Sequence, residues 1–418
     1  MRKFRSFVII AFTLTLIGVN ASMGKKLSKS SSASSSKAAA KTGAKAAAKK
    51  GAPQDQPITI GGEPVVQLTR PRATNSEKPQ FLGATFLPGE GMNMLAVKAY
   101  LPGMGEVELI SGPPTLAEAK DLFEKQNDEF GNESFKVGAA FLYPYVNRIR
   151  GKLSADGKTI ETMIAGKKLN LPANWHGKNP GAEINAMHGL ILDAKFEDVK
   201  SNNAAGESTI SATYHGGNFG GHWLSKSDVT IGATLKNYSL DLFVTAKNVG
   251  TENLPVAITV HPYYHFPSGD RTQARLEVPA DQRALVTNYD DVFPTGKIVP
   301  VKDTPYDFTG DKGAALGSLF MDDCFTDLKR NKDGSATIEV IDPKAKYGLR
   351  IIALSPHIQS VQVYAPPDKD FVAVEPQFNL ADPYNKKIWG DRDTGMVNVA
   401  PGKSVAWHIR LELFTPAQ

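Results

Sequence analysis

The segment 261–266, which reads His-Pro-Tyr-Tyr-His-Phe, joins an imidazole to two tyrosines. An imidazole has an unperturbed pKa near neutrality, so His261 could donate or accept a proton at physiological pH. The preceding run 256–261 alternates Val and Ile with Ala, Thr and His, which predicts a half-buried strand with His261 opposite its apolar face. Pro262 cannot donate a ladder hydrogen bond, so we expect regular pairing to stop or reach an edge there. A core histidine bonded to a tyrosine is the alternative interpretation.

Glu375 is the second candidate for proton transfer. It lies in the apolar run 371–376, Phe-Val-Ala-Val-Glu-Pro, in which Val372 and Val374 point to the face opposite Glu375. Burial at the end of such a strand, where we expect Pro376 to stop the pairing, would raise the carboxyl pKa towards the range of a general base. The alternative is a glutamate at a solvent-exposed strand end.

Four further residues carry weaker signals. Arg148 lies between apolar residues in the segment 145–151, and its guanidinium suits paired oxygen acceptors of a carboxylate or sugar; a structural salt bridge is the alternative. His188 precedes a glycine and alone reads as a turn residue. Asp322 and Asp323 are adjacent, and such a pair on a loop is usually solvated.

Other kinds of site find little support in the sequence. The Gly-rich stretch 215–222 begins and ends with histidine, but it lacks a carboxylate between them and the Lys-Ser/Thr ending of a phosphate loop. No Gly-x-Ser-x-Gly segment is present. Cys324 is the only cysteine, which excludes an internal disulfide and is typical of a buried thiol. We therefore expect no metal and no cofactor.

Short alternating runs predict the elements that must position these residues. The strand pattern recurs between turn residues from Pro57 onward, whereas a helical pattern appears only over 115–127. The sequence therefore predicts an all-β sandwich in one domain, 57–418, with division into two domains as the alternative. The predicted strands include 94–97, 208–214, 229–235, 239–244, 337–341, 360–364 and 408–413.

The N-terminal residues have a different composition. Residues 1–21 have the basic start, apolar centre and small residues of a signal peptide. Residues 22–56, rich in Lys, Ala and Ser, predict a disordered tether. Residues 1–52 contain 11 Lys and Arg and no Asp or Glu, so with a net charge of +5 the rest of the chain carries −6. An acidic folded part argues against a nucleic-acid partner. We expect export to a bacterial periplasm and no membrane span after signal removal.

In chain order, the motifs resemble the aldose 1-epimerase (galactose mutarotase) family. They are Asn-Arg-Ile at 147–149, His-Gly at 188–189, His-Pro-Tyr-Tyr at 261–264, Asp-Asp-x-Phe at 322–325 and Glu-Pro at 375–376. Thr-Pro-Tyr-Asp-Phe at 304–308 and Ala-Pro-Gly-Lys-Ser at 400–404 add to the resemblance, which covers about residues 80–415. It implies a large antiparallel β-sandwich, the galactose mutarotase-like supersandwich, in agreement with the strand pattern.

The resemblance also implies that the protein interconverts the anomers of a small-molecule aldose. Glu375 would take the proton from the anomeric hydroxyl and His261 would protonate the ring oxygen. The substrate-binding residues would be Arg148, Asn147, His188, Asp322 and Tyr263. Tyr264 and His265 replace the family's usual Phe and Asn after the catalytic His-x-Tyr, which bears on sugar specificity more than on chemistry.

Two alternatives to an epimerase remain. One is a non-catalytic carbohydrate-binding or glycan-processing accessory protein on the same fold. The other is a carbohydrate lyase or hydrolase; a hydrolase would need two carboxylates flanking one bond, and Glu375 alone is a clear candidate. Neither the sugar nor the oligomeric state follows from the sequence.

Overall fold

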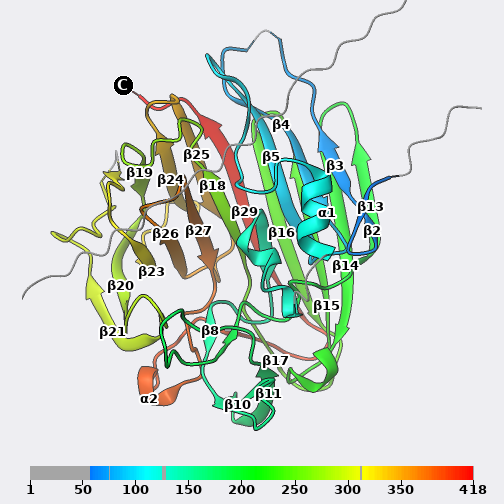
Figure 1. Cartoon of the computed structure of the whole chain (residues 1–418), viewed down its shortest axis with the longest axis vertical. Coiled ribbons are helices and arrows are strands. Elements are labelled where there is room, and N and C mark those ends of the chain that lie inside the picture. The colour runs from blue at the N-terminus through cyan, green and yellow to red at the C-terminus, as the bar shows by residue number, and fades with distance from the viewer. Residues whose placement is uncertain (1–56, 75, 125–128, 311–312, 418) are drawn as a thin grey trace, which may run out of the picture. The chain divides into compact units, whose positions relative to one another are not determined.

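The computed structural model describes residues 57–74, 76–124, 129–310 and 313–417, and it is built mainly from antiparallel sheets (Figure 1). The predicted signal peptide, residues 1–21, and tether, residues 22–56, lie outside the described residues. Within the described part of the chain, no helix is long and apolar enough to cross a membrane.

The largest sheet formed by the described strands has nine members, and each neighbouring pair in it is antiparallel. The strand nearest the C-terminus, β29, lies at its centre between β16 and β25. The strands follow in spatial order: β13 (Glu197–Asn203), β14 (Ser208–Gly217), β15 (Ser227–Leu235), β16 (Ser239–Asn248), β29 (Ser404–Phe414), β25 (Tyr347–Ala353), β24 (Ala336–Asp342), β19 (Arg275–Glu277) and β22 (Ala314–Ala315).

A second sheet, with seven described strands, carries the two candidate proton-transfer residues. His261 lies on β18 and Glu375 on the neighbouring strand β27. The strands in spatial order are β21 (Pro294–Pro300), β20 (Ala280–Val286), β23 (Met321–Leu328), β26 (Ser360–Ala365), β27 (Phe371–Gln377), β18 (Thr259–His265) and β7 (Ala139–Leu142).

Smaller sheets and helices complete the described structure. The four-stranded sheet consists of β3 (Val66–Thr69), β4 (Gln80–Leu87), β5 (Asn93–Leu101) and β6 (Gly105–Glu108). The remaining strands are β1 (Thr59–Ile60), β2 (Glu63–Pro64), β8 (Arg148–Ile149), β9 (Lys152–Leu153), β10 (Thr159–Ile164), β11 (Lys167–Pro172), β12 (Ala186–Met187), β17 (Leu254–Val256) and β28 (Val397–Val399). The helices are α1 (Leu116–Glu124), α2 (Lys386–Trp389) and the 3₁₀ helices η1 (Glu129–Gly131), η2 (Ser134–Lys136) and η3 (Phe219–Gly221).

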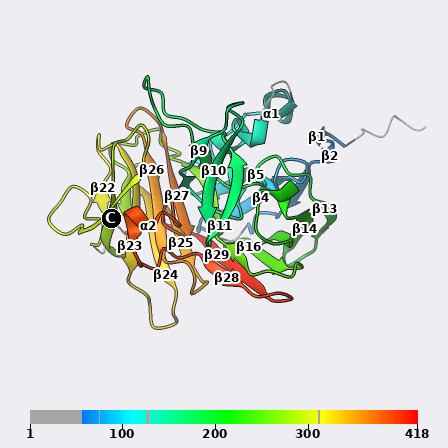
Figure 2. The same ribbon diagram turned by 90° about the horizontal axis from the view of Figure 1, so that it is seen from below.

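The sheets pack against one another as layers of a sandwich. In both views, β26 and β27 lie beside β24 and β25, while β4 and β5 lie beside β14 and β16 (Figures 1 and 2). One continuous cluster of buried apolar side chains fills the space between them. Burial of this cluster is the main favourable term for folding, because each large apolar side chain contributes about 1.5–3 kcal/mol.

The all-β prediction is confirmed, and each strand named from the sequence is present. The predicted helix over 115–127 is confirmed as α1, although residues 125–128 lie outside the described part. Thr115 caps this helix: its Oγ1 accepts the backbone N–H of Glu118 at 3.2 Å and donates to the Glu118 carboxylate at 3.0 Å. The bond from the Glu118 backbone N–H makes Thr115 the N-cap residue, which explains why the helix begins at Leu116.

Two local predictions on the site strands are wrong. The run 256–261 is not one half-buried strand: β17 ends at Val256, β18 begins at Thr259, and both are buried throughout except at His265. Pro376 does not stop β27, which continues to Gln377. The prediction for Pro262 is confirmed for one neighbour: pairing with β7 stops at this residue, and residues 263–265 pair with β27 instead. Stacked sheets bury these strands on both faces, which an alternating pattern alone does not reveal.

Candidate active site

One face of the seven-stranded sheet collects polar and aromatic side chains from four strands. Residues directly opposite each other in an antiparallel pair project to the same face, as do residues two apart along a strand. In the register, Glu375 lies opposite Gln362, and Tyr364 lies opposite both Ala373 and Asp322. The residues of this face are His261 and Tyr263 on β18, Ala373 and Glu375 on β27, Gln362 and Tyr364 on β26, and Asp322 and Cys324 on β23.

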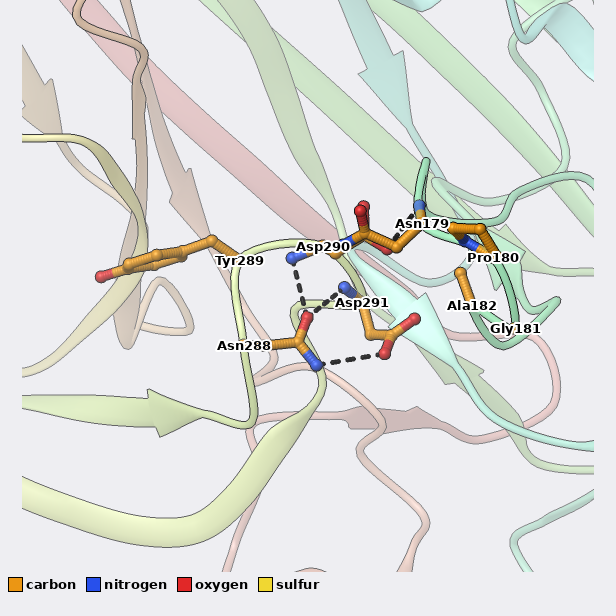
Figure 3. A pocket seen from close by; sticks show the side chains of 8 residues that line it. All are labelled: Asn179, Pro180, Gly181, Ala182, Asn288, Tyr289, Asp290 and Asp291. Atoms are coloured by element: carbon orange, nitrogen blue, oxygen red, sulfur yellow. Dashed lines mark hydrogen bonds between the residues drawn. The ribbon is translucent and has the colours of Figure 1, made fainter. Parts of the chain in front are cut away.

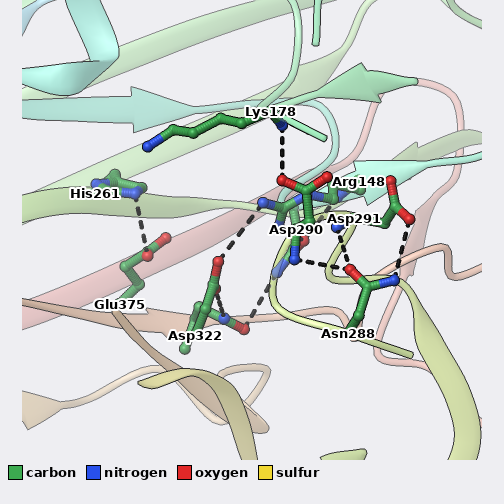
Figure 4. A network of polar contacts seen from close by, with 10 residues as sticks. Arg148, Lys178, His261, Asn288, Asp290, Asp291, Asp322 and Glu375 are labelled. Atoms are coloured by element: carbon green, nitrogen blue, oxygen red, sulfur yellow. Dashed lines mark hydrogen bonds and ion pairs between the residues drawn. The ribbon is translucent and has the colours of Figure 1, made fainter. Parts of the chain in front are cut away.

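The structure brings His261 and Glu375 together, although more than a hundred positions separate them in the sequence. The Nε2 atom of His261 lies 3.4 Å from Oε1 of Glu375 (Figure 4). His261 is 5% exposed and Glu375 is 2% exposed. Glu375 is therefore not an exposed glutamate at a strand end. The polar partner of His261 is this carboxyl group rather than a tyrosine. The contact places an imidazole and a carboxyl side by side in a dry environment.

Burial shifts both groups towards their neutral forms. It lowers the pKa of His261 to about 4, and the positive charge of Arg148 acts in the same direction. Burial raises the pKa of Glu375 well above its ordinary value, helped by the Asp322 carboxylate and opposed by Arg148. Both shifts favour the form of the pair in which the imidazole is neutral and the carboxyl carries the proton.

Arg148 and Asn147 belong to a closed polar network beside the pair. Nη1 of Arg148 donates to Oδ1 of Asn147 at 3.1 Å, and Nη2 lies 3.6 Å from Oδ2 of Asp322 (Figure 4). Nδ2 of Asn147 donates to Oε1 of Gln362 at 3.2 Å, and Nε2 of Gln362 donates to Oδ1 of Asp322 at 2.6 Å. Gln362 was not singled out from the sequence; its signal is an amide inside the apolar strand 360–364. The network fixes the direction of the guanidinium and the carboxylate.

The local backbone explains how Asn147 and His188 reach the site. Both have positive φ, 60° and 64°, a conformation that turns the chain sharply. The backbone N–H of His188 donates to the carbonyl of Asn147 at 3.0 Å, which locks the two turns together. The His188 ring centroid lies 5.2 Å from that of His261, and burial holds the pKa of His188 well below its usual range. His188 is therefore a neutral polar group facing the pair.

Aromatic rings enclose the two histidines. The Tyr263 ring centroid lies 4.8 Å from that of His261. Phe135, from η2, presents its ring edge-to-face to His188, His261 and Trp175 at centroid distances of 5.0, 5.9 and 5.5 Å. No sequence signal marked Phe135 or Trp175, because a single aromatic residue in an irregular segment has no diagnostic spacing. These rings contribute to the burial of His261 and His188.

Asp322 and Asp323 have different environments. They lie on strand β23 rather than on a loop, so their side chains point to opposite faces of the sheet. Asp322 faces Arg148 and the pair, whereas Asp323 is fully buried, pairs with Arg283, and accepts a hydrogen bond from the Tyr289 hydroxyl at 2.8 Å. The prediction of a solvated pair is wrong, and Asp322 is the member that belongs to the site.

Two surface cavities lie elsewhere. One, of about 520 Å³, is lined by residues 179–182 and 288–291 (Figure 3). The other, of about 270 Å³, is lined by residues between Pro383 and Asn398. Neither is lined by His261 or Glu375, so the site is identified by its buried acid–base pair and polar network rather than by cavity size. In the described residues, no group of three or more His, Cys, Asp and Glu is placed to hold a metal ion.

Comparison with known proteins identifies a family. Residues 115–412 match the family model described as aldose 1-epimerase. A galactose mutarotase-like protein from Clostridium acetobutylicum shares 18% identity and a TM-score of 0.63, over 84% of this chain and 98% of that one. A GalM/aldose epimerase homologue from C. elegans also shares 18% identity, with a TM-score of 0.62 over 84% and 99% of the two chains. Galactose 1-epimerase from Lactobacillus acidophilus shares 16% identity and a TM-score of 0.58, over 84% and 99%. A search of curated proteins found no match.

Proposed function

This chain belongs to the aldose 1-epimerase family, and from that membership and its buried acid–base pair we propose that it interconverts the α and β anomers of a free aldose. Anomer exchange needs the cyclic hemiacetal to open and close again. Opening removes a proton from the anomeric hydroxyl and adds one to the ring oxygen. An acid and a base held together avoid a free alkoxide, which is a poor intermediate near neutral pH.

Glu375 and His261 supply these two functions. Glu375 as carboxylate takes the proton from the anomeric hydroxyl while His261 as imidazolium protonates the ring oxygen, and the bond between the anomeric carbon and the ring oxygen breaks. The open-chain aldehyde rotates about its C1–C2 bond. Closure on the other face of the carbonyl reverses the two proton transfers and gives the opposite anomer.

The proton count of the pair is the same throughout this cycle. Carboxylate with imidazolium and carboxylic acid with neutral imidazole each hold one proton, and ring opening converts the first form into the second. Burial favours the second form in the free protein, since it lowers the pKa of His261 and raises that of Glu375. The dry site thus stabilises the protonation state that accompanies the open-chain aldehyde.

The surrounding residues orient the sugar. The Arg148 guanidinium and the His188 ring hold oxygens on the ring side, and the Asp322 carboxylate accepts hydrogen bonds from sugar hydroxyls. Asn147 fixes the direction of Arg148 and offers its amide to the substrate. The Tyr263 ring provides an apolar wall beside His261. Positioning by this set contributes to the rate because the pair must face two specific oxygens of one molecule.

The observation that carries the proposal is the 3.4 Å contact between buried His261 and Glu375. It is tested by NMR saturation transfer between the anomers of glucose, galactose and other aldoses. We expect the protein to accelerate exchange for at least one sugar. Glu375→Gln keeps the shape of the side chain but removes the base, so the rate should fall by about 10²–10⁴-fold.

Glu252→Gln is the matched control, because Glu252 is exposed and its carboxylate pairs with Lys167 on the surface. This variant should retain the full exchange rate. Absence of acceleration for all aldoses, or an undiminished rate in Glu375→Gln, would contradict the proposal. New reducing ends released from oligosaccharides would instead identify a hydrolase.

We also propose that the protein acts after export to the periplasm, on the support of the basic, apolar and small-residue regions of residues 1–21. Cell fractionation and the mass of the mature N-terminus test this. A mature chain that begins at Ser22 in the periplasmic fraction is expected. A chain that retains Met1 in the cytoplasmic fraction would contradict it.

A further inference from the structure

A row of aromatic rings leads away from the acid–base pair along the sheet. From His261 the centroid distances are 4.8 Å to Tyr263, then 4.9 Å from Tyr263 to Phe371 and 6.3 Å from Phe371 to Tyr364. Two further steps, 6.2 Å from Tyr364 to Phe320 and 5.0 Å from Phe320 to Tyr289, complete it. Tyr263, Phe371, Tyr364, Phe320 and Tyr289 lie in five different strands or loops, so the row is a product of the tertiary structure.

Exposure increases along this row. Tyr263 at the inner end is buried at 5%, Tyr364, Phe371 and Phe320 are partly exposed, and Tyr289 at the outer end is 39% exposed. Tyr364 lies opposite Asp322 in the register, which places the middle of the row on the same face as the pair. The row therefore connects the buried chemistry with the surface.

The outer end of the row is held rigidly. The Tyr289 hydroxyl donates to buried Asp323 at 2.8 Å and contacts the Tyr306 hydroxyl at 2.9 Å. The Arg283 guanidinium pairs with Asp323 and stacks 3.6 Å from the centroid of the Tyr306 ring. Tyr289 also lines the cavity formed by residues 179–182 and 288–291, and Figure 3 shows its ring pointing away from residues 179–182. An exposed tyrosine anchored by a buried ion pair presents a preformed, low-entropy surface.

The chemistry of this surface fits a glycan. One side of a pyranose ring is largely C–H and packs against aromatic faces, while its hydroxyls point outward to water and polar groups. We propose that the row binds glycosyl residues attached to the aldose in the site, so that the preferred substrate is the reducing end of an oligosaccharide. The inference rests on the proposed function, because it takes the sugar at His261 and Glu375 as its starting point.

Anomer exchange by NMR on paired substrates tests the proposal. Glucose, the reducing-end sugar of all three oligosaccharides, is compared with maltotriose, cellotriose and lactose. The full protein should have a higher kcat/KM for at least one of the oligosaccharides than for its reducing-end monosaccharide. Phe320→Ala removes the ring between Tyr364 and Tyr289 and should lower that kcat/KM about 10-fold while the monosaccharide value stays unchanged.

Two matched variants separate stacking from general damage. Tyr289→Phe removes the hydroxyl bond to Asp323 but keeps the ring, so it should retain the preference for the oligosaccharide. Tyr238→Ala removes another exposed tyrosine, which is 46% exposed and lies in the turn between β15 and β16. This variant should leave kcat/KM unchanged for both the monosaccharide and the oligosaccharide. Equal losses for monosaccharide and oligosaccharide in Phe320→Ala, or no preference in the full protein, would overturn the proposal.

Binding of reduced oligosaccharides distinguishes this proposal from the proposed function. Maltotriose and cellotriose reduced to their alditols cannot anomerise but keep the pyranose rings for the aromatic row. Calorimetric titration should show that one alditol binds and that Phe320→Ala weakens this binding about 10-fold. That result in a protein without epimerase activity would support the row and reject the epimerase. No effect of Phe320→Ala on alditol binding would reject the row.

Discussion

Residue His261 and residue Glu375 acquire their chemistry from the loss of water around them. An imidazole in water is half protonated near pH 6.5, and a glutamate is ionised above about pH 4.3. In the structure, burial lowers the pKa of His261 and raises that of Glu375, so that the carboxyl has the higher pKa of the two. In the proposed reaction, a pair with inverted proton affinities exchanges its proton through the bound sugar, which neither group could do alone.

The first prediction is a bell-shaped pH dependence of anomer exchange. Activity requires that the pair as a whole carries one proton. It should fall at low pH, when His261 is protonated near its pKa of about 4 while Glu375 is still protonated. It should fall again at high pH, when Glu375 loses its proton above the ordinary pKa range of glutamate. Measurement of kcat/KM by NMR between pH 3.5 and 9 should show an acid limb near pH 4 and a basic limb above the ordinary pKa range of glutamate. An acid limb centred at the ordinary pKa of histidine would contradict the burial argument.

The second prediction concerns stability. The folded state has a lowered His261 pKa, so between about pH 6.5 and pH 4 the unfolded chain binds more protons and stability decreases as the pH falls. From the pKa of about 4, this residue alone should lower the free energy of unfolding by about 2 kcal/mol between pH 7 and pH 5. In His261→Asn, the free energy of unfolding measured by urea denaturation should decrease less between pH 7 and pH 5. The same pH slope in His261→Asn and the unaltered protein would refute it.

At the scale of elements, turns rather than strands place Asn147 and His188 in the site. His188 is followed by Gly189 with φ of +84°, where the backbone passes directly against the backbone of Tyr143. A Cβ at Gly189 would collide with the Tyr143 carbonyl, so only glycine fits there. The N–H of Leu190 donates to this same carbonyl at 2.7 Å, which fixes the turn that presents His188.

The third prediction compares two glycines of nearly equal φ. Gly189→Ala should lower the free energy of unfolding by about 3 kcal/mol or more and displace His188, with loss of activity. Gly103→Ala has φ of +83° and open space around it, so it should cost only about 1 kcal/mol and leave activity unchanged. Urea denaturation and anomer exchange measure both. Equal costs for the two variants would show that the close approach to Tyr143 is unimportant.

At the scale of the whole molecule, the two large sheets meet beneath the acid–base pair. The carbonyl of Pro376, next to Glu375, accepts a hydrogen bond from the Trp407 indole of β29 at 2.8 Å. It also accepts one from the Thr259 hydroxyl of β18, the strand of His261, at 3.0 Å. One carbonyl thus ties both strands of the pair to the nine-stranded sheet, and the packing of the layers sets the distance between the two groups.

The fourth prediction tests this connection. Trp407→Phe removes the indole N–H and leaves a space in the core, so the free energy of unfolding should fall by about 2–4 kcal/mol. Because Glu375 follows the movement of Pro376, kcat should fall more than KM changes. Val405→Ala, on the same strand and face, should lower stability by about 1–3 kcal/mol with kcat retained. Retention of the full kcat in Trp407→Phe would contradict a positioning role for the inter-sheet bond.

The sequence by itself determined the fold class, most of the strands and which residues are candidates for proton transfer. Period-two alternation between turn residues is a local signal, and it predicted an all-β sandwich that the structure confirms. His261, Glu375 and Arg148 were found as polar residues in apolar surroundings, an anomaly visible in a single chain segment. The order of these motifs along the chain also indicated the family, because several short motifs in a fixed order are far more specific than any single motif.

Only the tertiary structure decided what surrounds those residues. The register of β23 against β26 selects Asp322 over Asp323, and the neighbour of an amide such as Gln362 depends on strands that are distant in sequence. Phe135 reaches the histidines from an irregular segment without periodicity. Burial on both faces, which inverts the proton affinities of the pair, arises when two sheets stack. Local sequence specifies dihedral preference and face, whereas depth and proximity are set by long-range packing.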